Sequence, residues 1–272
     1  MVMLCGKTDK SDLPKFLNVI NIDNWVAEEK FDGDRIRVLF KDGKISMHNR
    51  RYRDHTATFP ELHSLKFDGH KHVLLDGEMC VMIGGISAFN EGIAFRTHCK
   101  NPARIASGMK THPVVFVAFD LLELDGVDLR GTPLRERRRK LEALNIKHDC
   151  VEVAEQYKDI MPQWNRMQKE SREGLILKDM NSLYKEGYRS FAWRKVKNIQ
   201  EVDLKFTKYD VNTQGITVEN TDGIRCLVGG RHQWAVRDLI DKKGVATLTI
   251  NHLGQTKAGK FRQPTYNKVV VN

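Results

Sequence analysis

The chain has 272 residues, 40% of them hydrophobic, which is enough apolar material for one large packed domain or two smaller ones. No stretch approaches the roughly 18 apolar residues of a membrane span, and the start lacks a signal-peptide pattern. The five cysteines include no C-x-x-C pair, which predicts neither disulfides nor structural zinc. We therefore expect a cytoplasmic (intracellular) protein with no membrane partner. The 45 Lys and Arg against 35 Asp and Glu give a net charge of +10 and a pI near 9.3, which favours a polyanionic partner such as nucleic acid.

The first informative segment is residues 28–35, EEKFDGDR, in which Lys30 precedes an Asp-Gly pair and Arg35. Apolar residues alternate over residues 36–40, and a Lys-Asp-Gly-Lys turn then leads to residues 45–47, which predicts a hairpin with Lys30 at the mouth of its first strand. A lysine attacks only as the free amine, and its reference pKa is about 10.4, so a catalytic lysine needs neighbours that help it lose a proton. Arg35 could bind a phosphate or a ribose. The alternative is a solvated turn between two strands.

Further along the chain, the pattern predicts three buried strands and two helices. The strands are residues 73–75 before Asp76-Gly77-Glu78, residues 114–122, an apolar run broken by Asp120, and residues 175–177 after Glu173-Gly174. The helices are residues 133–144 and 159–172. Together they predict an α+β fold. The basic run at residues 135–140 is interpreted as the solvated face of the first helix.

The pattern of predicted secondary structure changes after about residue 200. Short β-like stretches such as residues 202–206 and 246–250 are separated by glycine-rich turns, which predicts a small barrel. We therefore expect two domains, residues 1–200 and residues 201–272.

Two groups of charged residues at strand ends could carry chemistry. Glu78 and Glu173 adjoin apolar strands, where carboxylates could hold Mg²⁺ together with substrate phosphates, or could simply face water. Lys195 and Lys197 are two residues apart, so in a strand they would share a face and reach one phosphate chain. Exposed lysines on an edge strand are the alternative.

Six segments in this order make the chain similar to ATP-dependent DNA ligases of the covalent nucleotidyltransferase superfamily, over essentially its whole length. They are KFDGDR at 30–35, SMHNR at 46–50 with FPEL at 59–62, DGE at 76–78, FVAFD at 116–120, EGLILK at 173–178 and WRKVK at 193–197. The resemblance implies a nucleotidyltransferase (adenylation) domain of antiparallel sheets and helices, followed by a small all-β OB-fold domain. That second domain agrees with the barrel expected from the pattern alone.

The resemblance also implies a reaction and the residues that perform it. Lys30 would attack the α-phosphorus of ATP and become lysyl-AMP, while Glu28 and Phe119 hold the adenine. Arg35, Arg50 and Glu78 would bind the ribose and phosphates. Glu78 and Glu173 would place Mg²⁺ (or Mn²⁺). Lys195 and Lys197 would neutralise the charge of the α-phosphate. AMP would then pass to the 5′-phosphate of a nick in duplex DNA, and the 3′-hydroxyl would displace it to seal the strand.

The C-terminal segment departs from the family pattern at one position. Arg262-x-Pro264-x-Tyr266 is similar to the ending of these ligases, which implies DNA binding and pyrophosphate orientation for Arg262. Val270 stands where a further arginine is common, and Lys268 is the candidate to substitute for it. We expect a minimal, monomeric enzyme acting on nicked duplex DNA. The competing hypotheses are an RNA ligase or capping-type nucleotidyltransferase, and a non-catalytic nucleic-acid-binding module.

Overall fold

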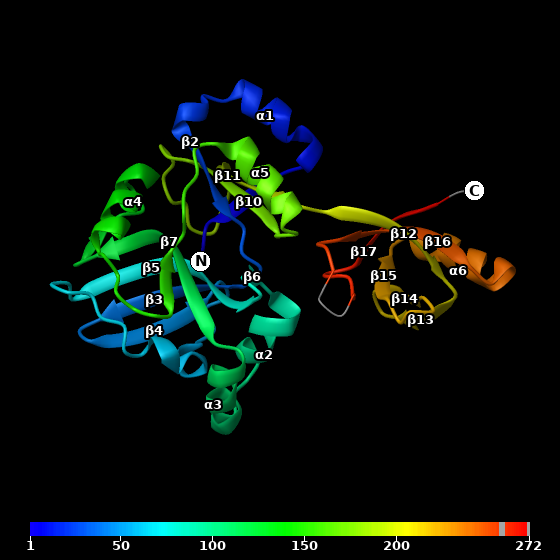
Figure 1. Ribbon diagram of the computed structural model, residues 1–272, viewed down its shortest axis with the longest axis horizontal. Helices are drawn as coiled ribbons and strands as arrows, with labels where there is room; N and C mark the ends of the chain where they lie inside the picture. The colour runs from blue at the N-terminus through cyan, green and yellow to red at the C-terminus, as the bar shows by residue number, and fades with distance from the viewer. Residues whose placement is uncertain (256–258, 271–272) are drawn as a thin grey trace. The chain divides into compact units, whose positions relative to one another are not determined.

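A computed structural model describes residues 1–255 and 259–270, and the chain divides into two compact units, Met1–Lys197 and Asn198–Asn272 (Figure 1). The first unit is built on two sheets and several helices. Its seven-stranded sheet has the order β4-β3-β5-β7-β8, with β6 paired to β5 and β9 paired to β7. These strands are β3 (Asp34–Lys41), β4 (Lys44–Asn49), β5 (His72–Ile83), β6 (Ile86–Ser87), β7 (Val114–Leu124), β8 (Val127–Asp128) and β9 (Val151–Val153).

The second sheet of this unit has four strands in the order β1-β11-β10-β2. They are β1 (Leu4–Thr8), β2 (Trp25–Glu29), β10 (Gly174–Asp179) and β11 (Arg189–Lys197). The mixture of sheets and helices confirms the predicted α+β class. The expectation of antiparallel sheets was too simple, because β1 runs parallel to β11 and β9 runs parallel to β7, although the other pairs in these sheets are antiparallel.

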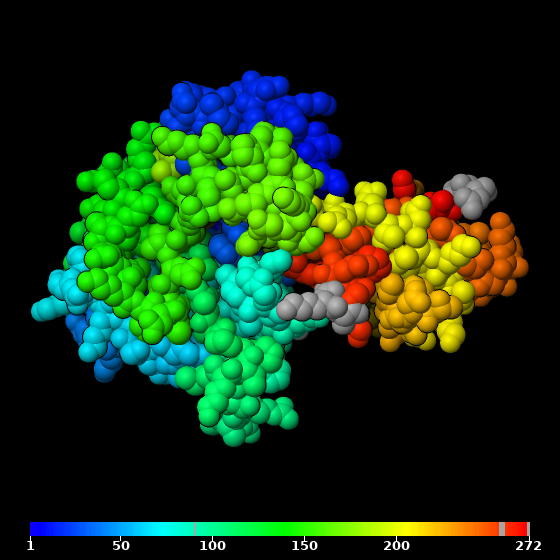
Figure 2. Space-filling view, in the orientation of Figure 1, coloured from blue at the N-terminus to red at the C-terminus, as the bar shows by residue number. Residues whose placement is uncertain are grey.

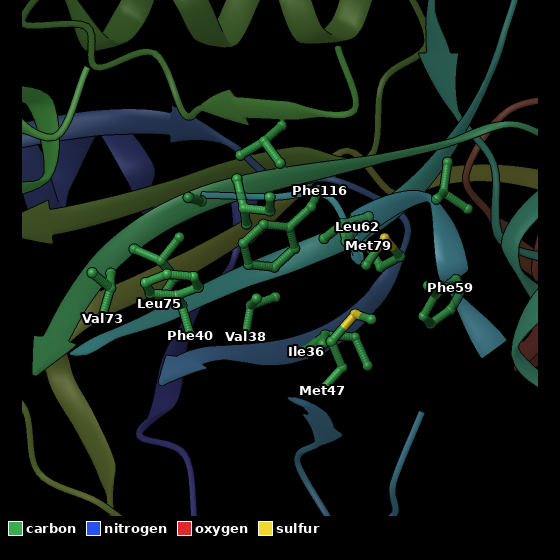
Figure 3. Close-up of a cluster of buried hydrophobic side chains, with 14 of the residues drawn as sticks. Ile36, Val38, Phe40, Met47, Phe59, Leu62, Val73, Leu75, Met79 and Phe116 are labelled. Carbon is green, nitrogen blue, oxygen red and sulfur yellow. The ribbon is translucent and has the colours of Figure 1, made fainter. Parts of the chain in front are cut away.

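The main core lies on one face of the seven-stranded sheet (Figure 3). The alternation in β3 places Ile36, Val38 and Phe40 on this face, where they are buried, as period-two spacing requires. The predicted hairpin is confirmed: β3 pairs with β4 through a turn in which Asp42 and Gly43 both have positive φ, 48° and 79°, the conformation that a tight hairpin turn needs.

Two helices cover one face of the four-stranded sheet. Helices α1 (Leu13–Val19) and α5 (Ile160–Lys169) pack their apolar side chains against Ala27, Leu175, Leu177 and Val196. Period-two alternation therefore turns the intervening residues of these strands to the opposite face, toward the seven-stranded sheet. This second face carries the candidate site.

The remaining helices of the unit follow β6 and β8. A π-helical turn, η5 (Phe89–Ile93), leads into α2 (Ala94–Thr97) and α3 (Pro102–Thr111), and the space-filling view shows the teal α2–α3 segment standing out from this unit (Figure 2). Single 3₁₀ turns lie at η1 (Lys10–Asp12), η2 (Ile22–Asn24), η3 (Thr56–Thr58) and η4 (Pro60–Leu62). Within the described residues, no helix combines the length and apolarity that a membrane crossing requires.

Helix α4 (Leu134–Ala143) corrects the interpretation of the basic run as a purely solvated face. Arg137 is fully buried, and its guanidinium donates to both carboxylate oxygens of Asp120 at 2.8 Å and to the carbonyl of Thr132 at 2.6 Å. Asp120 is the charged residue that interrupts the apolar run of β7. A bidentate pair with a third hydrogen bond is the arrangement that allows two charges to be buried together.

Among its described residues, 198–255 and 259–270, the second unit contains two three-stranded sheets and one helix. The first sheet has the order β12-β16-β17 and the second the order β13-β14-β15. The elements are β12 (Gln200–Phe206), β13 (Lys208–Asn212), β14 (Gly215–Glu219), β15 (Arg225–Gly229), α6 (His232–Lys243), β16 (Ala246–His252) and β17 (Thr265–Val269). Both sheets and α6 contribute to one apolar cluster.

The buried pair in α4 gives a stability prediction. Arg137→Ala leaves the Asp120 carboxylate buried without a cation, so we expect a loss of about 3–5 kcal/mol in unfolding free energy, measured by urea titration. Arg139→Ala in the same helix is the control, because Arg139 is exposed and its surface pair with Glu136 contributes little. Equal effects of the two substitutions would contradict the assignment.

Candidate active site

A cavity of about 270 Å³ lies between the facing surfaces of the two sheets in the first unit. The four-stranded sheet and its flanking segments supply one wall, and β3, β5 and β7 supply the other. Among the lining residues are seven of the sequence-predicted site residues: Glu28, Lys30, Arg35, Arg50, Glu78, Phe119 and Lys195. Predicted site residues that are far apart in the sequence are therefore brought together in one cavity.

The strand register explains why charged residues gather on this face. Ile176 in β10 lies opposite Glu28 in β2 and opposite Lys195 in β11, and Lys178 lies opposite Trp193. These residues alternate with Ala27, Leu175, Leu177 and Val196, which pack against the helices on the other face. The prediction that Lys195 and Lys197 share a face of one strand agrees with the span of β11, Arg189–Lys197.

Lys30 follows β2 directly, and both its backbone and its side chain are tied to the start of β10. Its backbone N–H donates to the carbonyl of Gly174 at 2.9 Å, and its Nζ donates to Glu173 Oε2 at 2.7 Å. The Nζ of Lys197 lies 3.1 Å from the other oxygen, Oε1, of the same carboxylate. Glu173 is almost fully buried, so one buried carboxylate is shared by two ammonium groups.

The charge state of Lys30 follows from this surrounding. Burial by itself lowers the pKa of Lys30, but the neighbouring carboxylates of Glu173 and Glu78 outweigh it and hold the pKa above its ordinary value. In this state Lys30 is an ammonium group at neutral pH. A nucleophilic role for Lys30 would require that one of these carboxylates take the proton or that their pull on it be weakened.

The conformation of the loop after Lys30 depends on Gly33 and Asp32. A Cβ at Gly33 would lie 2.4 Å from the carbonyl oxygen of Met79 and 2.7 Å from Glu78 Cγ, so only glycine lets the loop approach β5 this closely. Asp32 secures the loop, because its N–H donates to the Ser87 hydroxyl at 2.8 Å and its carboxylate accepts from the backbone N–H of Phe89 at 3.3 Å.

Arg35 lines the cavity, yet its guanidinium is already engaged by protein groups. It makes a bidentate pair with Asp76, at 3.0 and 2.6 Å, and donates to the carbonyl of Met3 at 2.7 Å. The Tyr184 hydroxyl donates to the same Asp76 at 2.6 Å. The sequence analysis assigned Arg35 to the nucleotide but did not identify Asp76 or Tyr184 as the groups that orient it.

Phe119 reaches the cavity through an irregularity in β7. Asp76 pairs with Asp120 and Gly77 pairs with Ala118, so Phe119 is the extra residue of a β-bulge. A bulge redirects a side chain relative to the regular alternation, which brings the ring into the cavity wall. The Lys178 ammonium lies 4.5 Å from the ring centroid and the Arg35 guanidinium 5.1 Å.

Glu28 is buried and both of its carboxylate oxygens have partners. Lys178 Nζ lies 2.6 Å from Oε2, and the Gln156 amide donates to Oε1 at 2.8 Å. Lys178 and Gln156 are site residues that the sequence analysis missed. Lys178 had a signal, since a lysine that ends a buried strand needs a partner; Gln156 lies in an irregular segment with no pattern to identify it.

The other predicted residues have varied surroundings. Burial raises the pKa of Glu78 to about 8, despite the opposing charges of Lys30 and Arg35. Burial, followed by the like charge of Lys197, lowers the pKa of Lys195. Arg50 is exposed at the rim.

Arg262 and Lys268 belong to the second unit, where Lys268 lies in β17 opposite Thr249, and the backbone N–H of Arg262 donates to the carbonyl of Gly254 at 2.9 Å. Their predicted roles remain predictions.

Two carboxylates could take part in holding a divalent cation. Within residues 1–255 and 259–270, no group of three or more His, Cys, Asp and Glu forms a metal site by itself. Mg²⁺ commonly uses only one or two protein carboxylates and completes its shell with water and substrate phosphates. Glu78 and Glu173 fit that role, because both raise the pKa of Lys30 and the charge of Glu173 also raises the pKa of Glu78. A bound cation would relieve the repulsion between the two carboxylates.

Comparisons with known proteins agree with this geometry. A family model described as "ATP dependent DNA ligase domain" matches residues 2–197. The chain is 31% identical over 191 residues to the SPbeta prophage-derived DNA ligase-like protein LigB of Bacillus subtilis, covering 70% of this chain and 67% of LigB. It is 32% identical over 198 residues to DNA ligase 2 of Korarchaeum cryptofilum, covering 65% of this chain and 32% of that protein.

Solved structures show the same fold over nearly the whole chain. A structure of a Lig E DNA ligase has a TM-score of 0.69 at 20% identity, covering 99% of this chain and 98% of the other. The ligase domain of LigD from M. tuberculosis has a TM-score of 0.60 at 22% identity, covering 99% and 94%. The first unit is thus an ATP-dependent DNA ligase domain. The chain belongs to the ATP-dependent DNA ligase family; it spans about two thirds of LigB and about one third of DNA ligase 2.

The raised pKa of Glu78 gives a pH prediction. An acid whose pKa is higher in the folded chain contributes stability that is present below its ordinary pKa of 4.5 and is lost as the pH rises to about 8. The melting temperature of Glu78→Gln minus that of the wild type should therefore increase by several degrees between pH 5 and pH 8.5, in the presence of EDTA. A difference that is constant with pH would contradict this environment for Glu78.

Proposed function

We propose that the chain seals nicks with 5′-phosphate and 3′-hydroxyl ends in duplex DNA, with Lys30 as the residue that carries AMP. The observation that carries the proposal is the placement of Lys30 Nζ, 2.7 Å from the buried Glu173 carboxylate, in a cavity that also presents Arg35, Glu78 and Lys195. Lig E DNA ligases, to whose fold the chain is similar, are described as binding DNA with a minimal scaffold. This supports DNA as the substrate.

In the first step, Lys30 Nζ loses a proton and attacks the α-phosphorus of ATP. The new N–P bond forms as the bond from this phosphorus to the oxygen of the leaving pyrophosphate breaks. Glu173 accepts a hydrogen bond from Nζ and is placed to take the proton. Lys195 and Lys197 neutralise charge on the α-phosphate. Mg²⁺ or Mn²⁺ held by Glu78 and Glu173 would supply charge neutralisation on the leaving phosphates.

In the later steps, AMP moves from Lys30 to DNA and then leaves. An oxygen of the 5′-phosphate attacks the AMP phosphorus, which breaks the N–P bond and restores Lys30. The 3′-hydroxyl then attacks the 5′-phosphate and displaces AMP. Positioning and charge neutralisation account for most of the catalysis in such transfers.

Adenine recognition is assigned to the wall formed by Glu28 and Phe119. The ring of Phe119 offers a surface on which a base can stack, and the carboxylate of Glu28 can accept from an exocyclic amino group. Lys178 and Gln156 hold this carboxylate in place, at 2.6 and 2.8 Å. A base that presents a carbonyl in place of the amino group would meet an acceptor instead of a partner, which supports ATP over GTP.

We assign the two units to the family's two domains. The adenylation domain is the unit Met1–Lys197 and the OB-fold domain is the unit Asn198–Asn272, where two short-stranded sheets share one apolar cluster; this division lies three residues before the boundary at residue 200 that the sequence predicts. Arg262 and Lys268 are assigned to DNA binding and to orientation of pyrophosphate. The protein would act as an intracellular monomer.

An adenylation assay tests the proposal. Wild-type protein incubated with α-labelled ATP and Mg²⁺ should acquire acid-labile AMP on a lysine, Lys30→Ala should acquire none, and Lys195→Ala should react more slowly. Label chased onto a nicked duplex without ATP should leave the protein as the strand is sealed. Nicked RNA and GTP serve as competing substrates; label retained by Lys30→Ala, or sealing of RNA in preference to DNA, would contradict the proposal.

The net charge of +10 predicts steep salt dependence of nick binding. Because phosphate contacts release condensed counterions, the Kd for a nicked duplex should rise about a hundredfold or more between about 50 and 200 mM salt. Fluorescence anisotropy with a labelled duplex measures this directly. A flat response over that range would show that basic charge does not hold the DNA.

A further inference from the structure

Lys30 and Glu173 lie just outside the strands that carry them. Strand β2 ends at Glu29, the residue before Lys30, and β10 begins at Gly174, the residue after Glu173. The last pair of the β2–β10 ladder is Glu29 with Leu175. Beyond it, the backbone N–H of Lys30 donates to the carbonyl of Gly174 at 2.9 Å. Contacts of the flanking residues can therefore decide how Lys30 and Glu173 face each other.

The residues directly before Lys30 and Glu173 form an ion pair with each other. Arg172 Nη1 donates to both carboxylate oxygens of Glu29, at 2.9 Å in each case. The Glu29 side chain is 9% exposed and the Arg172 side chain 19%, so water screens this pair less than a surface pair. Two ion pairs thus join the same two segments, since Lys30 Nζ lies 2.7 Å from Glu173 Oε2.

The pair of Glu29 and Arg172 lies toward the helix side of the sheet. Period-two alternation places Glu29 on the same face of β2 as Ala27, which packs with α1 and α5. Arg172 and Glu29 both line a separate cavity of about 710 Å³. Among the described residues, Arg172 does not line the nucleotide cavity and Lys30 does not line the separate one. Arg172 is therefore placed to influence Lys30 through the backbone, without contacting a nucleotide.

The end of α5 holds Arg172 in place. The backbone N–H of Arg172 donates to the carbonyl of Met167 at 2.9 Å, and the intervening Ser171 has a φ of 52°, the left-handed conformation in which many helices end. Arg172 Nε also donates to Glu170 Oε2 at 2.6 Å. Both the backbone and the guanidinium of Arg172 are fixed, so its pair with Glu29 connects the end of α5 to the end of β2.

Burial makes the Glu29 carboxylate depend on its cation. Burial raises the pKa of Glu29, and the hydrogen bond and the charge of Arg172 oppose that rise. Removal of Arg172 would leave a buried carboxylate without this partner, which costs more than the loss of a surface pair. Movement of Glu29 toward water would shift Lys30 as well, because the two residues are consecutive.

We propose that Glu29 and Arg172 are positioning residues for adenylation, because their ion pair holds the ends of β2 and α5 together and so sets the placement of Lys30 Nζ against Glu173. The inference rests on the proposed function, in which Lys30 attacks ATP from this position, and it adds a pair that lies behind the reacting groups. A displacement of about 1 Å at reacting groups can cost roughly a hundredfold in rate, so a contact one residue away is sufficient to matter.

The test measures two quantities for each variant. One is the single-turnover rate constant of adenylation at saturating ATP and Mg²⁺, and the other is the Kd for α,β-methylene-ATP, which cannot release pyrophosphate. We expect Arg172→Ala and Glu29→Ala each to slow adenylation roughly tenfold or more, while the Kd changes less than about twofold. Arg172→Lys should recover most of the rate, because one nitrogen contacts both Glu29 oxygens and an ammonium group can do the same.

The matched control is Glu170→Ala. This substitution removes the other partner of the same arginine, an exposed carboxylate at the end of α5, and leaves the connection to β2 intact. We expect its adenylation rate to stay within about twofold of the wild-type rate, as for the loss of a surface ion pair. A loss as large as that of Glu29→Ala would overturn the assignment to the pair.

The two substitutions also separate positioning from a direct effect of charge. Arg172→Ala removes a positive charge and Glu29→Ala a negative one, so charge acting on Lys30 alone would change the rate in opposite directions. Loss of position slows both variants. The double variant should lose much less than the product of the two single losses, because the pair is broken only once.

Slower adenylation in both single variants with unchanged analogue binding supports the proposal. An unchanged rate in either variant, changes in opposite directions, or losses that multiply in the double variant overturn it. A parallel loss of analogue binding also overturns it, because that result indicates a general structural defect. If Arg172→Ala does not fold, the comparison of Glu29→Ala with Glu170→Ala gives the decision.

The same assay separates failure of this inference from failure of the proposed function. If wild-type protein carries no AMP on Lys30, the proposed function fails and the positioning role fails with it. If wild-type protein carries AMP on Lys30 and the variants acquire it at the wild-type rate, only the positioning role of Glu29 and Arg172 fails.

Discussion

The site depends on one buried carboxylate, Glu173, that is shared by the ammonium groups of Lys30 and Lys197. A lone buried carboxylate would be costly, and two ammonium groups near each other would repel. Because the Glu173 carboxylate pairs with both ammonium groups, its own charge is compensated and the repulsion between the two lysines is reduced. The arrangement also sets the reactivity of Lys30, whose pKa is held above its ordinary value. Under the proposed function, the resting chain therefore holds Lys30 as an ammonium group, and a neighbouring carboxylate has to take its proton before Lys30 can attack.

This interaction is possible because two sheets face each other with polar residues between them. Helices α1 and α5 bury the apolar face of the four-stranded sheet, which leaves the alternate residues to face the seven-stranded sheet. From that second sheet come Glu78, in register with Arg35, and Phe119, which is directed into the cavity by a β-bulge. The partners of these residues are mostly other protein groups: Asp76 holds Arg35, and Lys178 holds Glu28. Such a network fixes the cavity before the substrate arrives, which lowers the cost of binding.

Local patterns in the sequence were sufficient for several of the elements and for the placement of charged residues at strand ends, whereas most of the site roles came from the resemblance to the ligase family and remain predictions. The hairpin after Lys30 follows from alternation and an Asp-Gly turn, and the short spacing of Lys195 and Lys197 follows from strand periodicity. Pairings between distant residues could not be found in this way. Glu28 and Gln156 are 128 positions apart, and the bulge that turns Phe119 depends on how β7 pairs with β5. The burial of Arg137 is a further case, because its partner Asp120 lies on another element and a helix rich in arginine gives no local sign of which one turns inward.

The most direct test of the account is to identify which lysine carries AMP, because Lys30, Lys178 and Lys195 all line the same cavity. Peptide mapping by mass spectrometry, under alkaline conditions that preserve the N–P bond, would locate the modified residue after incubation with ATP and Mg²⁺. The account predicts AMP on Lys30 alone, with faster labelling in a pH range where its ammonium group begins to lose the proton. AMP on Lys178 or Lys195, with Lys30 unmodified, would contradict it.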